Sequence, residues 1–271
     1  MVALTLSSVL VVLVSTTFLV QNQFYAIQVE RAAAQDNARM VTEMLAAELR
    51  PVMEGGVFRA DNKRLGVRSP VVVGVICGHA SGNRASVHLT GGVTNLTTSE
   101  VGGVALRDTL TGDWTYVDAS WSNTHQPGVG HNPAGTCAAN GADTAGISAE
   151  FQTFRRFNNY FGSLPPLGSV VMFYRKMEYR FNTSGMDATT TALYRGLWGE
   201  TLVEFATGLD STAQFMYRTG GSTYATSVSG SSTDDIDAIR IVAQARRKPQ
   251  TGGVDDVTFG WGVNIHLRNA R

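Results

Sequence analysis

The chain has 271 residues, of which 43% are hydrophobic, and its 22 Lys and Arg balance its 22 Asp and Glu. This length allows one large domain or two small ones, with a sizeable buried core. A net charge of zero, with only 16% charged residues, gives no long-range attraction to nucleic acid or to anionic lipid. The 29 glycines indicate a loop-rich β protein beyond residue 50.

The N-terminal segment is apolar and uncharged: the first 29 residues carry no charged side chain. Residues 2–20 are long enough to cross a hydrocarbon core, which needs about 20 residues. No basic stretch precedes this run and no small-x-small cleavage site follows it, unlike a removed signal peptide. We therefore expect a retained membrane anchor.

A single long helix is predicted for residues 2–50, because Gly and Pro are missing there and Pro51 ends it. Its first half is apolar all round, with small residues that permit close helix contacts. The residues predicted for a membrane or filament contact are Leu4, Ser8, Val11, Ser15 and Phe18.

The second half of this helix is amphipathic. Five apolar residues recur at helical spacing and predict a face that packs on the folded head: Ala34, Ala38, Val41, Leu45 and Leu49. The chain thus divides into a helix at 1–50 and a β-rich head at 51–271.

Strands are predicted along the head by apolar or alternating runs bounded by Gly and Pro. They lie at 69–76, 84–89, 114–121, 169–181, 192–197, 213–218, 236–246 and 259–268, and a long Gly/Asn/Pro-rich loop is expected at 122–150. The later strands follow one another without helical spacers, which favours an antiparallel sheet and an α+β fold.

The chain resembles the type IV pilin and pseudopilin family. The start Met1-Val2-Ala3-Leu4 resembles the interior of the pilin signature, and the segment from Ala34 to Arg50 resembles the helix end of the minor pilin W and type II secretion pseudopilin J group. So do the stretch 203–217, the strand at 238–242 and the end at 263–269. The likeness covers the helix well, the last hundred residues loosely, and residues 57–165 not at all.

This resemblance implies a pilin-like fold, a long N-terminal helix on an antiparallel head, and a function in filament assembly. It implies other pilin or pseudopilin subunits and the inner membrane as partners, with the head in the periplasm. The family's cleavage glycine and its glutamate have no counterpart in the chain, and we expect them before Met1, where a prepilin peptidase would cut.

Motifs that carry enzyme chemistry are missing: the sequence contains no HExxH, P-loop, GxSxG, SxxK or complete GxGxxG. We expect a non-enzymatic protein with no catalytic, cofactor or metal residues.

Cys77 and Cys137 are the only cysteines. In an oxidising compartment they would form a disulfide. Free thiols are one alternative, and a metal site that adds His79, His125 and His131 is another, although its spacing matches no known zinc module.

We expect two further groups of charged residues to lie on the solvent-exposed surface without a binding role. The acidic turns at 234–237 and 255–256 supply oxygen ligands of the kind that calcium prefers, but the EF-hand pattern is missing. The basic spots at 155–156 and 246–248 are too short to predict nucleic-acid binding.

The function expected from the sequence is a non-enzymatic minor pilin or pseudopilin subunit, which assembles through its helix into a type IV pilus or type II secretion pseudopilus and acts in a priming or tip complex. The alternative is a signal-anchored periplasmic enzyme or binding protein whose helix is only a tether.

Overall fold

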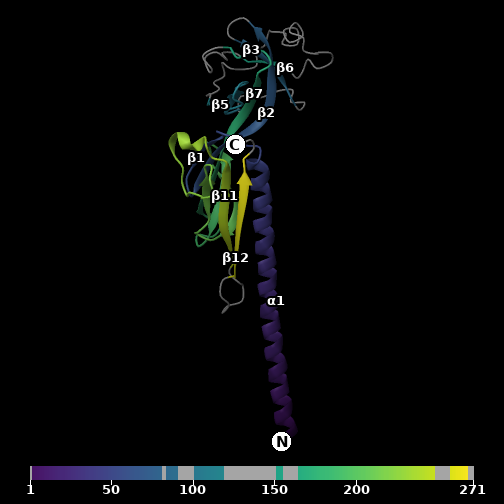
Figure 1. The fold of residues 1–271 in the computed structure, drawn as a ribbon. Helices are drawn as coiled ribbons and strands as arrows, with labels where there is room; N and C mark the ends of the chain where they lie inside the picture. Colours follow the sequence, from purple (N-terminus) through teal and green to yellow (C-terminus); the bar gives the residue numbers. More distant parts are fainter. Residues whose placement is uncertain are drawn as a thin grey trace.

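The computed structural model describes residues 2–80, 84–90, 101–118, 151–154, 164–247 and 257–267. In this part of the chain one long helix lies beside a 12-stranded sheet whose strand pairs are all antiparallel (Figure 1). The predicted α+β arrangement of a long N-terminal helix and an antiparallel sheet is therefore confirmed.

Helix α1 spans Val2–Leu49. Its 48 residues give a length of about 72 Å at 1.5 Å per residue. It ends where the sequence predicts, just before Pro51, with the amide of Val52 donating to the carbonyl of Leu49 at 3.0 Å. Its N-terminal end projects far from the sheet (Figure 1).

The described strands are β1 (Val57–Ala60), β2 (Arg64–Ala80), β3 (Arg84–Leu89), β4 (Gly103–Arg107), β5 (Trp114–Val117), β6 (Phe151–Phe154), β7 (Val170–Thr183), β8 (Thr191–Leu197), β9 (Val203–Leu209), β10 (Gln214–Arg218), β11 (Ala238–Arg247) and β12 (Val257–His266). A short 3₁₀ helix, η3, spans Gly230–Thr233. The loop predicted at 122–150 lies outside the described residues.

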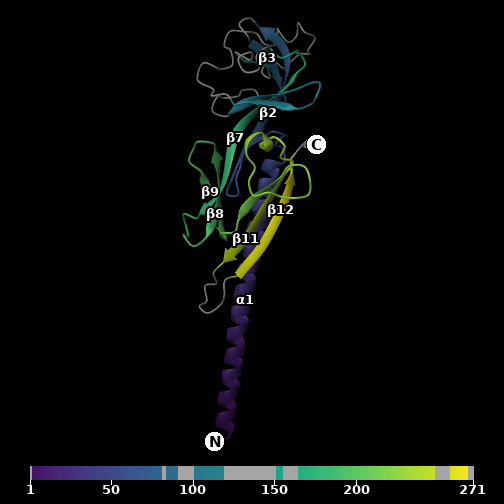
Figure 2. The same cartoon turned by 60° about the vertical axis from the view of Figure 1, so that its left-hand side comes forward.

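The main path of the sheet runs β10-β11-β9-β8-β7-β2-β3-β6, with β12 on β11, β1 on β2, and β4 between β7 and β5. The head has two lobes: one lies against α1, and the other, which contains β3, lies beyond the C-terminal end of α1 (Figure 2). Strands β2 and β7 are 17 and 14 residues long and run through both lobes. They act as the shared spine of the two lobes.

A β-bulge between Pro70 and Val72 adds one residue to β2. Side chains alternate between sheet faces, so an added residue exchanges odd for even positions. Accordingly, the buried apolar side chains of β2 are Leu65 and Val67 before the bulge and Val72 and Ile76 after it. The bulge keeps these four buried apolar side chains on one face of the β2–β7 pair.

Two main hydrophobic clusters result. The larger one contains the end of α1 together with residues of β2 and β7 to β12, among them Leu45, Tyr179, Phe215 and Ile241. The second lies in the lobe far from α1 and contains Ile76, Val87 and Phe173. The head thus has one core under the helix and a separate core above it.

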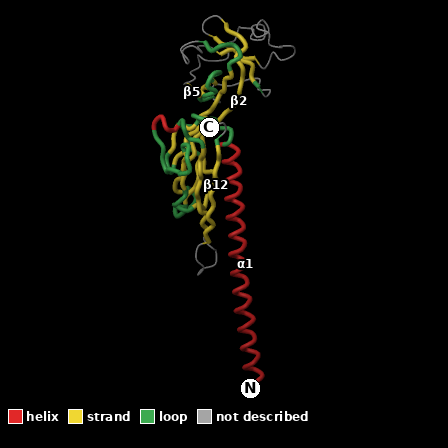
Figure 3. Tube along the Cα trace, in the orientation of Figure 1, coloured by secondary structure: helices red, strands yellow, loops and turns green. Residues whose placement is uncertain are grey.

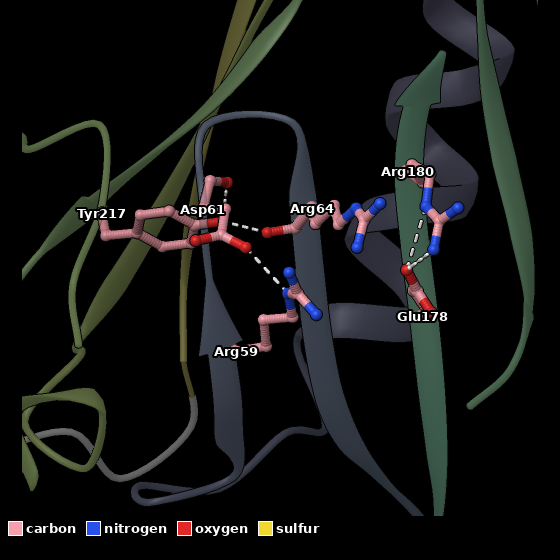
Figure 4. A network of polar contacts seen from close by, with 6 residues as sticks. All are labelled: Arg59, Asp61, Arg64, Glu178, Arg180 and Tyr217. Atoms are coloured by element: carbon pink, nitrogen blue, oxygen red, sulfur yellow. Dashed lines mark hydrogen bonds and ion pairs between the residues drawn. The ribbon is translucent and has the colours of Figure 1, made fainter. Parts of the chain in front are cut away.

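Polar contacts close the β1–β2 turn onto β10 (Figure 4). The hydroxyl of Tyr217 lies 2.8 Å from the carbonyl oxygen of Asp61 and 3.1 Å from that of Arg64. Arg59 pairs with the Asp61 carboxylate at 2.7 Å, and Arg180 pairs with the buried Glu178 at 2.6 Å. These contacts satisfy polar groups at the margin of the larger core.

Cys77 of β2 was predicted to form a disulfide with Cys137, and in the structure Cys77 is disulfide-bonded. Cys137 lies outside the described residues, so its pairing with Cys77 stays a prediction. We expect unreduced protein to show a mass lower by two hydrogens, and the bridge, closing a loop of about 60 residues, to stabilise the fold by up to about 4 kcal/mol. Free alkylation of both thiols in native protein exported to an oxidising compartment would contradict this prediction.

Candidate assembly surface on the long helix

The N-terminal half of α1 has no strand beside it in the described structure (Figure 3). Two of the predicted contact residues are strongly exposed, Val11 at 64% and Phe18 at 71%, and Ser15 is exposed as well. The side chains of Leu4 and Ser8 lie outside the described part of the structure. A row of large apolar side chains facing solvent is unstable in water and marks a lipid or protein contact.

The polar side chains of this half are partly satisfied by the helix itself. The hydroxyls of Thr16 and Thr17 both donate to the carbonyl of Leu13, at 2.9 and 2.8 Å. Such internal hydrogen bonds lower the cost of placing a hydroxyl in an apolar environment. By length and composition α1 could cross a membrane as an anchor or a signal sequence, and it is the one helix in the described residues with this property.

The C-terminal half of α1 lies on the sheet. The structure places all five side chains of the predicted stripe in the buried face: Ala34, Ala38, Val41, Leu45 and Leu49. They pack mainly toward β12 and β11. One half of the helix is docked on the head and the other half is exposed. The docked half therefore fixes the direction of the exposed half relative to the head.

A polar clamp holds the end of α1 to the sheet. Glu48 accepts a hydrogen bond from the hydroxyl of Tyr179 at 2.5 Å and pairs with Arg195 of β8 at 2.5 Å. Burial, and then the hydrogen bond to Glu48, raises the pKa of Tyr179. The sequence analysis assigned no role to Glu48. Its position three residues after Leu45 is the only local signal for it.

A groove of about 700 Å³ opens beside the middle of α1. Its walls come from α1, from the turn between β7 and β8, and from β9 and β11. The lining residues are Ala34, Asn37, Ala38, Met40, Val41, Ser184, Met186, Asp187, Thr189, Thr190, Glu204, Phe205, Ala206, Thr207, Gly208, Leu209 and Ala245. The sequence did not predict this groove.

Hydrogen bonds fix the carboxylates of the groove. Glu204 accepts from the Ser184 hydroxyl at 2.6 Å and from the amide of Gly185 at 3.1 Å. Asp187 accepts from the amide and hydroxyl of Thr189, at 2.9 and 2.7 Å. Both negative charges are therefore held in place on one wall.

A second polar cluster joins the two lobes. Asp118, after β5, pairs with Arg68 of β2 at 3.2 Å and with Lys176 of β7 at 2.8 Å, and accepts from the hydroxyl of Tyr174 at 2.8 Å. Despite partial burial, the hydrogen bonds from Arg68, Lys176 and Tyr174 lower the pKa of Asp118. Asp118 thus ties β2 and β7 to the segment that follows β5, which indicates a structural role for the cluster.

The residues of the weaker sequence hypotheses are scattered. Of the acidic turn, Asp237 pairs with Arg218 at 2.9 Å, and residues 255–256 lie outside the described structure. His79 lies 2.8 Å from the carbonyl oxygen of Pro165, whereas His125 and His131 are not described. Within the described ranges, no three His, Cys, Asp or Glu side chains form a group that could hold a metal ion.

Comparison of the chain with protein-family models, with curated proteins and with solved structures gave no match.

Proposed function

We propose that this protein is a pilin-like, non-enzymatic assembly subunit, which is anchored in the bacterial inner membrane by α1 with its head in the periplasm. It assembles through α1 with other pilin or pseudopilin subunits into a type IV pilus or a type II secretion pseudopilus, in a priming or tip position.

One observation carries the proposal: α1 is a single continuous helix that is buried on the head at one end and bare and apolar at the other. An anchor alone needs apolar length, but not a continuous connection to a docked helix. In an assembly subunit, this connection transmits the orientation of the head to the helix contacts.

The small residues Ser8 and Ser15 of α1 support the same function, because small side chains permit close helix packing in lipid. The oxidised state of Cys77 agrees with a periplasmic head.

We expect the double substitution Ser8→Leu with Ser15→Leu to preserve membrane insertion, because both changes raise hydrophobicity. Assembly should fall severalfold, because the added bulk blocks close approach between helices. Thr17→Leu is the matched control, since it adds similar bulk about 200° around the helix from Ser15. Membrane fractionation and a piliation or secretion assay in the same strain measure both properties.

The tether hypothesis makes the opposite prediction. If residues 2–20 are replaced by a generic Leu/Ala span of equal length and the assay is unaffected, then α1 is only an anchor. In that case the proposal of an assembly subunit is wrong.

A further inference from the structure

The face of the sheet that points away from α1 carries basic side chains on neighbouring strands. Leu65 of β2 and Tyr179 of β7 point into the larger core under α1, so the alternate residues of both strands point to the opposite face. Arg64 of β2 and Arg180 of β7 are two of these alternate residues, and they stand directly opposite each other in the β2–β7 register. Two positive charges therefore face each other across the strand pair.

Arg59 of β1 extends this arrangement to a third strand. It stands opposite Gly66 of β2, and a side chain on Gly66 would begin only 3.0 Å from the Cβ atom of Arg59, so both positions project from the same face. In the view of Figure 4, the guanidinium group of Arg64 lies between those of Arg59 and Arg180. We call these three arginines the basic row. Neighbouring strands are about 4.8 Å apart, so the row is about 10 Å wide across the strands.

The central charge of the basic row is not balanced inside the protein. Arg59 pairs with Asp61 at 2.7 Å. Arg180 pairs with Glu178 at 2.6 Å. Arg64 is partly exposed, and its guanidinium group forms no ion pair with any residue that the structure describes. Like charges directly opposite on paired strands destabilise a sheet, so an anion from another molecule would relieve the repulsion at this point.

The surplus of positive charge around the basic row is small. Arg68 and Lys176 lie further along β2 and β7 and share Asp118, at 3.2 and 2.8 Å. Together with the ion-paired residues beside it, the row has five basic side chains and three acidic ones: Arg59, Arg64, Arg68, Lys176 and Arg180 against Asp61, Asp118 and Glu178. A surplus of two charges is complementary to a short segment with two carboxylates rather than to a long polyanion.

The aromatic rings on this face carry cations. The Arg59 guanidinium lies 5.7 Å from the ring centre of Trp198, and the Lys176 ammonium lies 5.2 Å from that of Phe58. The two rings also contact each other edge to face, with their centres 5.0 Å apart. Single-stranded nucleic acid binds where bases can stack on free aromatic faces, whereas these rings hold basic side chains in position. This arrangement favours a peptide over a nucleic-acid strand.

We propose that the basic row binds an extended acidic peptide segment of a partner protein, with two carboxylates that pair with Arg64 and one of its neighbours. Alternate side chains of an extended peptide share one face at a spacing of about 7 Å, which is within the width of the row. A guanidinium group pairs with a carboxylate through two parallel hydrogen bonds, which gives the contact its specificity. The row lies on the opposite face of the sheet from α1, so this binding site is additional to the proposed function and does not depend on it.

The test is the binding of a fluorescent peptide of alternating Glu and Ser to the full-length protein in a non-ionic detergent, measured by fluorescence anisotropy at low salt. We expect saturable binding that weakens severalfold as salt is added. A peptide of alternating Gln and Ser should not bind. Arg64→Gln should raise the Kd for the Glu peptide about tenfold, as expected for the loss of a close interfacial charge pair.

Arg240→Gln is the matched control. It removes the same charge from an exposed arginine that lies on β11, outside the basic row. The net charge of the two variants is therefore equal, and Arg240→Gln should change the Kd by less than about twofold.

The stability of Arg64→Gln separates binding from a structural role. The main-chain carbonyl of Arg64, which lies 3.1 Å from the Tyr217 hydroxyl, is retained in this variant. Since the substitution removes one of two opposed like charges, the free energy of unfolding in urea should stay unchanged or rise. A clear loss of stability would mean that the Arg64 side chain holds the fold together, and the inference would be wrong.

Two results in the binding assay would also overturn the inference. One is equal binding of the Glu and Gln peptides, or equal binding of the Glu peptide by Arg64→Gln and the unmodified protein. The other is tighter binding of an oligothymidylate with the same number of charges, lost in Arg64→Gln, which would assign the basic row to nucleic acid. Neither result bears on the proposed function, which depends on α1.

Discussion

The stability of the protein should fall steeply above about pH 10, the ordinary pKa of a tyrosine side chain. Tyr174, Tyr179 and Tyr217 are buried, with exposed fractions of 1% or less. Burial raises the pKa of all three phenols, and hydrogen bonds to Asp118 and Glu48 raise those of Tyr174 and Tyr179 further.

The sign of the effect follows from proton binding. Above about pH 10 the unfolded chain releases these phenol protons, whereas the folded chain retains them. Fewer protons are bound in the unfolded state, so the free energy of unfolding decreases as the pH rises. Each tyrosine contributes about 1.4 kcal/mol per pH unit, so the three together contribute about 4 kcal/mol per unit. Below this range their contribution is fully present.

Urea unfolding of the full chain in detergent, measured over a series of alkaline pH values, checks this expectation. Tyr217→Phe should lower the slope by about 1.4 kcal/mol per pH unit, since one buried phenol proton is lost. Tyr25, which is 70% exposed on α1, supplies the control Tyr25→Phe, which should leave the slope unchanged. Tyrosinate absorbance that rises while the protein is still folded and equally stable would contradict the prediction.

The long helix could be read from the sequence because its determinants are local. The lack of Gly and Pro sets its length, Pro51 sets its end, and the spacing from Ala34 to Leu49 sets its buried face. Strands β3, β8 and β10 are likewise predicted within about one residue, because each is a short apolar or alternating run between turn residues.

Other strands could not be predicted because their stability comes from tertiary contacts. β1 and β6 have four residues each and β4 has five, too few for a period to be recognised. β9 also gives little pattern, since its sequence VEFATGL has only interrupted apolar residues. The prediction at 69–76 covered only half of β2, because the charged residues Arg64 and Arg68 belong to its first half.

The groove and the clamp lie beyond sequence reasoning for a different reason. Glu48 and Tyr179 are 131 residues apart, and Glu48 and Arg195 are 147 residues apart. The groove likewise combines α1, the β7–β8 turn and β9. Its acidic character depends on which carboxylates the folded chain brings together, and no spacing in the sequence records this.

We expect the buried stripe of α1 to dominate the docking of the head, and Leu45→Ala to show this. Leu45 is 1% exposed and belongs to the larger hydrophobic cluster. Removing its side chain should destabilise the fold by about 2–5 kcal/mol, through lost burial and the cavity that remains.

Met44→Ala is the matched control, because Met44 is the adjacent residue of the same helix but is 41% exposed. Its substitution should change the free energy of unfolding by less than about 1 kcal/mol, as expected for a surface position. Urea unfolding of both full-length variants in detergent measures the difference. Equal effects would mean that α1 does not use this face against the head, and the connection between a docked and a bare helix half, on which the proposed function depends, would then be lost.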